Sequence, residues 1–212
     1  MTIVCIADTH GMHKDIIVPD GDTLVVAGDV TGRGTLPDLV RFLSWMASWP
    51  HKHKVLIAGN HDRCFQDKPD EVAGLLEPYD IYYLQDSAII LDGVKFYGSP
   101  WQPEFCDWAF NLQRGDQLKR VWAKIPDDVN VLVTHGPPYG VLDFAQYGRE
   151  RVGCRDLADR IQDLKELDTH VFGHLHEDYG QVCKGDVQYV NASVCSLNYA
   201  PTNKPVVVDT AG

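Results

Sequence analysis

Five segments of the chain carry side chains that can bind metal ions or transfer protons. They read Asp8-Thr9-His10, Gly28-Asp29, Gly59-Asn60-His61-Asp62, His135-Gly136 and Gly173-His174-Leu175-His176. Together these segments hold five of the nine histidines of the chain. Carboxylate, amide and imidazole ligands without thiolate suit Mn, Fe, Zn or Ni ions, and they differ from the ligands of a cysteine-rich structural zinc site. The residue types therefore predict a metal site without cysteine ligands.

The spacing inside the segments agrees with this prediction. Residues i and i+2 of an extended chain point to the same side, so Asp8 with His10 forms one short clamp and His174 with His176 forms another. Glycines next to the polar residues allow the backbone to turn sharply and to approach an ion closely. The candidate ligands are Asp8, His10, Asp29, Asn60, His135, His174 and His176. Seven ligands are too many for one four-coordinate ion and fit two ions that share a bridging carboxylate.

Each segment follows a short apolar run that is typical of a β-strand. Strands are predicted at residues 3–7, 23–27, 54–58, 88–91, 94–97, 129–134, 169–172, 187–191 and 206–208, because these runs are bounded by polar loops that contain glycine. Ligand sites of α/β proteins form at the carboxyl ends of strands. We therefore expect the five polar segments to meet at one edge of the molecule.

Two helices are indicated by apolar stripes at helical spacing. The first stripe comprises Leu36, Leu39, Val40, Leu43 and Ala47 after the N-cap candidate Thr35, and the second comprises Leu157, Ile161, Leu164 and Leu167. Strands alternate with helices early in the chain, and the C-terminal part is rich in strands. This order predicts an α/β sandwich rather than a simple parallel sheet. Because no repeat or composition shift divides the chain, we expect one domain over residues 1–212.

The composition limits the classes of partner. The 212 residues include 30 acidic and 19 basic side chains, which gives a formal net charge of −11. This excess disfavours long nucleic acids and anionic membranes, since both require a basic surface. No apolar run approaches the roughly 20 residues of a membrane span. The first residues lack the basic region of a signal peptide. The six cysteines form no C-x-x-C pair. Together these two observations predict reduced thiols and a cytoplasmic location.

In their order along the chain, the five segments resemble the motifs of the calcineurin-like metallophosphoesterase superfamily: D-x-H, G-D, G-N-H-[DE], H and G-H-x-H. Further stretches at residues 98–101, 108–111, 134–138, 172–177 and 191–195 resemble the small metallophosphoesterases of the MPPED type. The resemblance implies a four-layer α-β-β-α sandwich of two mixed sheets flanked by helices. It also implies two divalent metal ions, with Mn favoured among Mn, Fe, Zn and Ni.

The resemblance further implies a role for each polar residue. The implied ligands are Asp8, His10 and His176 for one ion, Asn60, His135 and His174 for the other, and Asp29 as the bridge between them. His61 would lie beside the substrate, and Asp62 would fix the orientation of His61. One departure is informative, because residues 28–34 read GDVTGRG and lack the second aspartate of the G-D-x-x-D-R-G motif of protein serine/threonine phosphatases. A phosphoprotein phosphatase is therefore disfavoured.

We expect a dinuclear metal-dependent phosphodiesterase that hydrolyses a small phosphate-ester substrate by attack of a metal-bridging hydroxide. His61 is the expected proton donor to the leaving oxygen, because histidine titrates near working pH. A hydrogen bond from His61 to a phosphate oxygen is the alternative role. The resemblance favours small diesters, cyclic nucleotides among them. A broad phosphomonoesterase is the alternative activity, and the intact ligand set disfavours a non-catalytic binding module.

Two further groups of residues have two interpretations each. Arg33, Arg63, Arg149, Arg151 and Arg155 either contact phosphate or are exposed charges, and the second interpretation is favoured. Trp101, Phe105, Trp108 and Phe110 either stack on a nucleobase or pack across the sheets, and packing is favoured. His13 either lines the site or lies in a solvated loop.

Overall fold

Buried strands rich in Val, Ile and Ala form a five-stranded sheet in the order β15-β1-β2-β3-β4 of the computed structural model, which describes residues 1–210. The strands are β1 (Thr2–Ile6), β2 (Thr23–Ala27), β3 (His53–Ile57), β4 (Tyr82–Tyr83) and β15 (Val206–Asp209). Strands β1 to β4 are parallel, and β15 runs antiparallel to β1. The nearly continuous apolar character of β1 and β2 reflects burial of both faces of the sheet.

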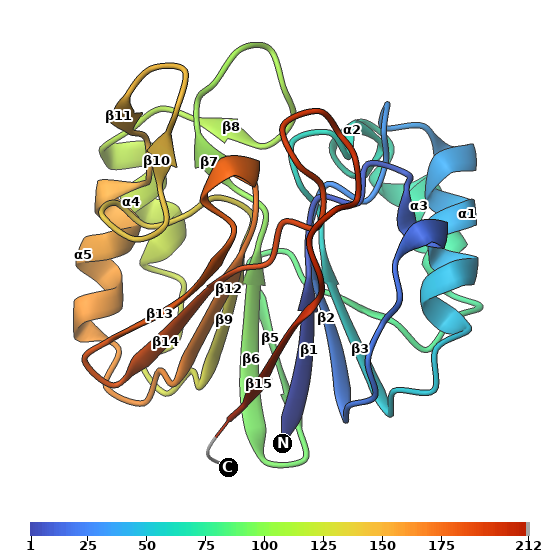
Figure 1. Cartoon of the computed structure of the whole chain (residues 1–212). Coiled ribbons are helices and arrows are strands. Elements are labelled where there is room, and N and C mark those ends of the chain that lie inside the picture. Colours follow the sequence, from blue (N-terminus) through green and yellow to red (C-terminus); the bar gives the residue numbers. More distant parts are fainter. Residues whose placement is uncertain (211–212) are drawn as a thin grey trace.

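A six-stranded sheet in the order β13-β14-β12-β9-β6-β5 lies beside the first one (Figure 1). Its strands are β5 (Ser87–Leu91), β6 (Val94–Ser99), β9 (Val131–Thr134), β12 (Thr169–Phe172), β13 (Gly180–Lys184) and β14 (Val187–Asn191). The four central strands are parallel, and the edge strands β5 and β13 are antiparallel to their neighbours. Two short ladders pair β7 (Gln102–Pro103) with β8 (Asn111–Leu112) and β10 (Phe144–Ala145) with β11 (Glu150–Arg151).

Helices cover the outer face of each sheet. The helices are α1 (Leu36–Ala47), α2 (Arg63–Asp67), α3 (Pro69–Leu76), α4 (Asp116–Trp122) and α5 (Arg155–Asp163), with the 3₁₀ turns η1 (His13–Asp15) and η2 (His176–Asp178). Figure 1 shows α1 and α3 beside the first sheet and α4 and α5 beside the second. The predicted four-layer α-β-β-α sandwich is therefore confirmed. Among the described residues, no helix combines the length and the apolar character that crossing a bilayer requires.

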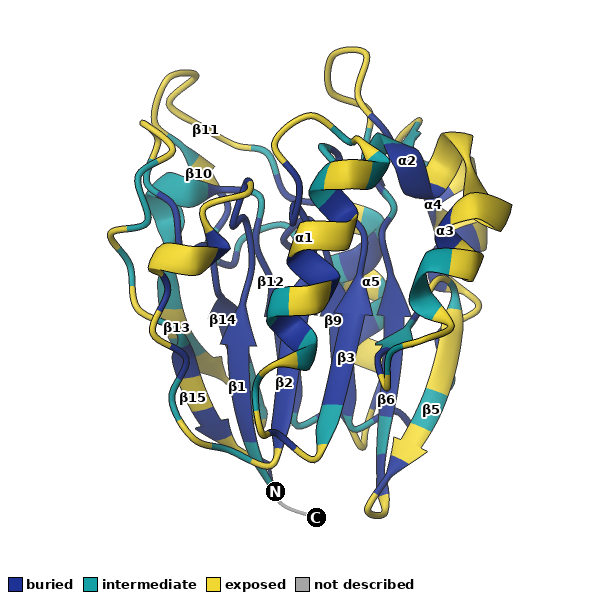
Figure 2. Cartoon of the chain, turned by 90° about the vertical axis from the view of Figure 1, so that its right-hand side faces the viewer, coloured by how far each residue is buried: buried dark blue, intermediate teal, exposed yellow. Residues whose placement is uncertain are grey.

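Three apolar clusters hold the layers together. The cluster between the sheets contains Val25 and Val55 from the first sheet and Phe96 and Val171 from the second, all fully buried. The other two clusters pack α1 to α3 against the first sheet and α4 and α5 against the second. Figure 2 shows this pattern as buried central strands behind a helix α1 whose outer face is exposed.

The first predicted helix is present as α1, and the Thr35 side chain accepts a hydrogen bond from the Asp38 N–H at 3.2 Å, as an N-cap residue does. Its buried face differs in one respect from the predicted stripe. Val40 is 38% exposed, because the residues that face the sheet also include Phe42 and Met46 and the buried face is rotated away from Val40.

The second predicted helix is shorter than its apolar stripe. Helix α5 ends at Asp163, and Leu164 and Leu167 are buried from the segment that follows the helix. The apolar spacing continued past the helix end because the connection also packs on the sheet. The six cysteines form no disulfide, and Cys106 and Cys183 are exposed while the other four are buried.

Candidate metal centre

The carboxyl ends of parallel strands from both sheets meet at one edge of the sandwich. Asp8, Asp29 and Asn60 follow β1, β2 and β3 of the first sheet, whereas His135 and His174 follow β9 and β12 of the second. The two sheets are in direct contact there, because the His174 N–H donates a hydrogen bond to Asp8 Oδ2 at 2.8 Å. The fold thus assembles residues that are far apart in the sequence, as the strand pattern predicts.

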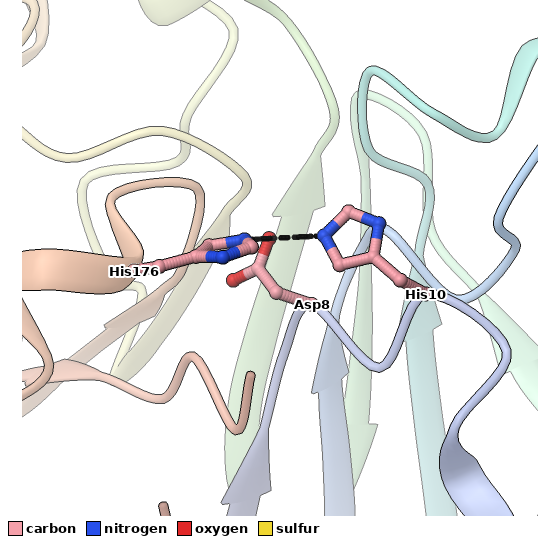
Figure 3. Close-up of side chains that lie close together, drawn as sticks. All are labelled: Asp8, His10 and His176. Atoms are coloured by element: carbon pink, nitrogen blue, oxygen red, sulfur yellow. Dashed lines mark hydrogen bonds and ion pairs between the residues drawn. The ribbon is translucent and has the colours of Figure 1, made fainter. Parts of the chain in front are cut away.

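The first group of the candidate centre consists of Asp8, His10 and His176 (Figure 3). The Nε2 atoms of His10 and His176 are 3.1 Å apart, and Asp8 Oδ1 lies 3.9 Å and 3.6 Å from them. Asp8 Oδ1 is buried and has no hydrogen-bond partner among the described residues. Two imidazole nitrogens and an unpartnered carboxylate oxygen that converge in this way fit a divalent cation.

Asp29 lies between this group and a second one. Its Oδ2 is 3.7 Å from His10 Nε2, and its Oδ1 is 3.4 Å from His135 Nε2. Asn60 Oδ1 is 2.9 Å from the same His135 nitrogen. The two oxygens of Asp29 therefore face two different sets of ligand atoms, which is the arrangement that a bridging carboxylate requires.

Two of the histidines are held by backbone carbonyls on their far sides. His135 Nδ1 is 2.9 Å from the Ala27 carbonyl oxygen, and His176 Nδ1 is 3.0 Å from the Ser196 carbonyl oxygen. A carbonyl oxygen only accepts hydrogen bonds, so each Nδ1 carries the proton. In the neutral imidazole the Nε2 lone pair is then free to bind an ion, as is usual for metal-binding histidines.

His174 and His61 occupy different positions relative to these groups. The His174 ring lies against His135 with a centroid distance of 5.1 Å, but its ring nitrogens belong to none of the three residue groups whose ligand atoms lie within 4.8 Å of one another. Those groups are Asp8 with His10 and His176, His10 with Asp29 and His61, and Asp8 with Asp29 and His135. His61, expected beside the substrate, is therefore also close enough to reach an ion.

The backbone of the candidate centre is strained. Asp8, His10, Asp29 and His174 have positive φ angles of 55°, 44°, 53° and 72°. Such conformations cost of order 1–3 kcal/mol for residues other than glycine, and they cluster at functional sites. Close packing adds to the constraint, since a Cβ atom on Gly59 would lie 2.3 Å from Asp29 Oδ1. Only glycine fits at this position.

Carboxylates and imidazoles shift the pKa values of one another in opposite directions. Burial alone would raise the pKa of Asp8, but the neighbouring His176 outweighs burial and lowers the pKa to about 2. Asp29 is likewise held well below its usual pKa, against the effect of burial, by His135. Burial alone would lower the pKa values of His135 and His176, but Asp29 and Asp8 raise each of them to about 9. Protons on these imidazoles therefore compete with metal ions for the same lone pairs.

Asp62 is fully buried, and its carboxylate accepts hydrogen bonds from backbone groups. The donors are the N–H groups of Val30, Thr31 and Gly59, at 3.1, 2.9 and 2.9 Å. Burial and the Asp29 charge raise the pKa of Asp62 to about 6. Asp62 thus holds the loops after β2 and β3 together, and its carboxylate binds these backbone groups rather than the His61 ring.

His61 is held by other neighbours. Its N–H donates to Asp29 Oδ1 at 2.7 Å, and its ring stacks on Trp108 with a centroid distance of 4.3 Å and an interplanar angle of 23°. His61 Nδ1 lies 3.4 Å from the Gly32 carbonyl oxygen. The backbone of His61 is therefore fixed to the candidate centre, and its ring is placed by Trp108.

A cavity of about 700 Å³ opens beside the candidate centre. Its walls include two sets of residues: the polar residues His10, Asp29, Asn60, His61, His174 and His176, and the exposed apolar residues Phe105, Trp108, Tyr147, Leu197 and Tyr199. The sequence patterns did not single out Tyr147, Leu197, Tyr199 or Arg114, which also lines the cavity. These residues follow no motif, and only the folded loops bring them together.

Of the aromatic residues and arginines with two interpretations, two aromatic residues line the cavity and the others lie elsewhere. Phe105 and Trp108 line the cavity, whereas Trp101 and Phe110 pack against each other in a T-shaped contact with a centroid distance of 5.5 Å. None of the five arginines with two interpretations lines the cavity. For example, Arg63 lies near Asp67 and Asp107, Arg151 is paired with Asp143, and Arg155 stacks on Tyr139.

His13 also lies outside the cavity and differs from both interpretations of its role. It is 3% exposed and packs against Phe42 and Trp45, with ring-centroid distances of 5.6 and 5.4 Å. His13 is therefore part of the contact between η1 and α1 rather than a residue of a solvated loop.

Comparisons with known sequences agree with the geometry. The sequence model described as Calcineurin-like phosphoesterase matches residues 1–178. Metallophosphoesterase domain-containing protein 1 of Homo sapiens is 42% identical over 229 residues, which cover 97% of this chain and 70% of that protein. A UPF0046 protein of Caenorhabditis elegans is 38% identical over 219 residues, which cover 98% of this chain and 74% of that protein.

A solved structure supports the same fold. A dimetal phosphatase from Danio rerio superposes with a TM-score of 0.58 over 97% of this chain and 90% of that chain, at 11% sequence identity. At this identity the similarity concerns the fold alone. The family match over most of the chain, the identity to its relatives and the convergence of carboxylates and imidazoles lead to one conclusion: the chain belongs to the calcineurin-like phosphoesterase family, and it is a metal-dependent phosphoesterase.

Proposed function

We propose that this phosphoesterase is a dinuclear phosphodiesterase that acts on small phosphate diesters, with cyclic nucleotides among its substrates. One observation carries the proposal. Five strand ends from two sheets bring carboxylate, amide and imidazole groups to one point, where Asp8 Oδ1 has no hydrogen-bond partner among the described residues, and this point borders a cavity of about 700 Å³. A buried, unpartnered carboxylate oxygen that faces two imidazole nitrogens is expected where a cation binds.

The proposed ligands of one ion are Asp8, His10 and His176, those of the other are Asn60, His135 and His174, and Asp29 bridges both. Divalent ions held by these residues would activate water for attack and would offset the charge that develops on phosphoryl oxygens. Mn is the proposed metal, and all six cysteines are free, which fits the cytoplasmic location that we propose.

His61 is the proposed proton donor to the leaving ester oxygen. Its backbone is bonded to the bridging Asp29, and its ring faces the cavity and is stacked on Trp108. The side chain would therefore lie beside a phosphate bound at the centre, and it is not needed to complete the seven proposed ligands. Proton donation by a positioned histidine contributes typically 10²–10⁴-fold to the rate.

The charges along the cavity support a diester rather than a monoester. Among the described residues that line it, Arg114 is the only Lys or Arg, and its guanidinium donates to the carbonyl oxygens of Gly153 and Val152 at 2.8 and 2.5 Å. The carboxylates of Glu104, Glu150 and Glu177 line the same cavity. A monoester dianion would bring a second negative charge to these groups, whereas a diester brings one charge and an organic group for the aromatic walls.

The proposal is tested with metal-stripped protein that is reconstituted with Mn, Ni, Zn or Mg. Each form is assayed with an aryl phosphate monoester, an aryl phosphate diester and a cyclic nucleotide. We expect metal-dependent hydrolysis with the diester preferred. Asp29→Ala, with its metal content measured, is the matched control that attributes the activity to this centre.

Two outcomes contradict the proposal. Hydrolysis of no substrate with any metal contradicts the assignment as an active phosphodiesterase. A preference for the monoester favours the alternative, a broad phosphomonoesterase.

A further inference from the structure

The segment Asn191-Ala192-Ser193 is one of the sequence stretches that the proposed reaction does not use. It follows β14, and Ser193 is fully buried. Ser193 Oγ lies 2.6 Å from Asp8 Oδ2 and 2.7 Å from Asn191 Oδ1. A buried hydroxyl between a candidate ligand and an amide can donate to only one of them, because it carries a single hydrogen.

The amide of Asn191 is oriented by its own hydrogen bonds. Its Nδ2 donates to the Leu175 carbonyl oxygen at 2.7 Å, which turns its Oδ1 toward Ser193. That oxygen also accepts the Ser193 N–H at 3.2 Å, so Asn191 Oδ1 has a donor that is independent of the hydroxyl. The Ser193 hydroxyl is then free to donate to Asp8, and a bond to a carboxylate is stronger than one to a neutral amide.

Asp8 Oδ2 therefore receives two hydrogen bonds, from the Ser193 hydroxyl and from the His174 N–H. These two donors fix the plane of the carboxylate. The other oxygen, Asp8 Oδ1, receives none among the described residues and faces the Nε2 atoms of His10 and His176. The same two hydrogen bonds thus determine which Asp8 oxygen is left for an ion.

The backbone holds Ser193 in place relative to Asp8. The Ala7 N–H donates to the Ala192 carbonyl oxygen at 2.8 Å, and the Val194 N–H donates to the Ala7 carbonyl oxygen at 3.0 Å. These bonds join the end of β1 in the first sheet to the continuation of β14 in the second. Ser193 is therefore placed by the contact between the two sheets and not by a flexible loop.

We propose that Ser193 is a positioning residue for Asp8, and that it presents Asp8 Oδ1 to the ion shared with His10 and His176. The inference rests on the proposed function, since it assumes that Asp8 is a metal ligand. Asn191 contributes by occupying its own amide groups with Leu175 and the Ser193 N–H, which leaves the serine proton for Asp8.

The test compares Ser193→Ala with wild-type protein, both stripped of metal and titrated with Mn²⁺ while the free ion is followed by electron paramagnetic resonance. We expect Ser193→Ala to bind one of two ions about 10- to 100-fold more weakly, as loss of a partner of a metal ligand typically does. The second ion, held by His135 and Asn60, should keep its affinity within about threefold. The half-maximal Mn²⁺ concentration for diester hydrolysis should rise, while kcat at saturating Mn²⁺ stays close to wild type.

A matched control is available in the same fold. Ser99 is also fully buried, and its Oγ donates to Asp86 Oδ1 at 2.8 Å, but Asp86 is no candidate ligand. Ser99→Ala should leave both Mn²⁺ affinities unchanged. Ser193→Thr restores a hydroxyl and should recover most of the lost affinity, whereas Ser193→Cys, with a weak donor of similar shape, should not. Thermal unfolding of the metal-free variants shows whether each one is folded.

The possible results separate the two proposals. If wild-type protein binds no ion pair, the proposed function fails. If wild type binds two ions and Ser193→Ala and Ser193→Cys bind both with unchanged affinity, only the role of Ser193 is wrong. Equal weakening by Ser99→Ala and Ser193→Ala would also contradict that role, because it would reflect a general loss of packing. If Ser193→Ala does not fold, the comparison of Ser193→Cys with Ser193→Thr decides the question.

Discussion

His61 combines a fixed backbone with a side chain that lies against the cavity. Its N–H is bonded to Asp29, whereas none of its ring atoms is bonded to the other candidate ligands. The ring instead stacks on Trp108 and lies next to His10 at a centroid distance of 4.5 Å. A side chain with this placement can act on a bound ester without being required to hold an ion.

Replacing His61 by alanine should therefore lower turnover and leave metal binding intact. We expect kcat for an aryl diester to fall by about 10²–10⁴-fold, as for loss of a positioned proton donor. Metal analysis of the same sample should still find two ions per chain. Loss of an ion from His61→Ala would instead make His61 a ligand, which its closeness to His10 and Asp29 also permits.

The loop between β7 and β8 forms the wall of the cavity that contains Trp108. Asn111 at the end of this loop donates from Nδ2 to the carbonyl oxygens of Phe105 and Cys106, at 3.1 and 2.9 Å. The Ala109 N–H donates to the Asn60 carbonyl oxygen at 3.2 Å. The loop is thus bonded both to itself and to the segment that precedes His61, so Trp108 is placed by backbone contacts on either side.

Trp108→Leu should disturb the His61 ring and leave the ions in place. Aromatic pairs contribute about 0.5–1.5 kcal/mol, so we expect kcat to fall roughly 2- to 12-fold, and Trp108→Phe should retain most of the activity. Phe105→Leu is the comparison, because Phe105 lines the same cavity but its ring contacts His174 rather than His61. That variant should change KM more than kcat. If Trp108→Leu instead changed KM more than kcat, Trp108 would serve substrate binding and not the placement of His61.

Most strands were predictable, including the edge strands β5 and β15, whereas the edge strand β13 and the paths of the loops were not. The bounds predicted for β2 and β12 agree with the structure, and every residue of these two strands is buried. Strand β13 escaped prediction because its sequence GQVCK contains Gly180 and Lys184 and has no continuous apolar run. The edge strand β5 is also mostly exposed, but its apolar run Ala88–Leu91 reveals it. The sequence also could not distinguish the cavity residue Trp108 from the core residue Phe110. Both are aromatic residues of the same short segment, and only the folded loop exposes one and buries the other.

The candidate ligands were predictable as a set, because each one follows a strand end and ends of parallel strands converge. Their partners were not. Ser193 lies 185 positions from Asp8 in the sequence, and no local spacing indicates that the two are hydrogen-bonded. The same holds for Asp62, whose contacts with Val30 and Thr31 depend on how the loops after β2 and β3 lie together.

At the scale of the whole molecule, the candidate centre lies where the two sheets meet, beside the apolar cluster between them and the backbone hydrogen bonds of Ala7 with Ala192 and Val194. Asp29 and Asn60 come from the first sheet, and His135 and His174 come from the second. Ions that bind both sets would stabilise the folded chain by the free energy of binding and so raise its melting temperature. The size of this effect depends on pH, because protons occupy two of the imidazoles in the metal-free protein.

The difference in melting temperature between the metal-loaded and the metal-free form should increase as pH rises from 6.5 to 8.5. Carboxylates raise the pKa values of His135 and His176 to about 9. The stabilisation from these two pairs is complete below the ordinary histidine pKa of about 6.5 and is lost as pH rises through about 9. Over the same range ions bind more tightly, since fewer protons compete with them.

Calorimetric scans with and without Mn²⁺ under anaerobic conditions measure this difference. His53→Gln is the control, because His53 pairs with the exposed Asp92, far along the strand from the candidate centre, and this variant should keep the same pH dependence. A difference in melting temperature that stays constant from pH 6.5 to 8.5 would contradict competition between protons and ions at His135 and His176.

The pairing of β1 with β15 determines how the molecule would respond to a pulling force. Thr2 pairs with Asp209 at the end of the sheet away from the candidate centre, where strand β1 begins and strand β15 ends (Figure 1), and the ladder closes with Cys5 opposite Val206. In this antiparallel pair, a force applied between Thr2 and Asp209 opens the rungs one after another, as in a zipper, rather than shearing them together. Tension therefore reaches Asp8 only after the whole ladder has opened. The force needed to separate β1 from β15 would then not depend on bound metal.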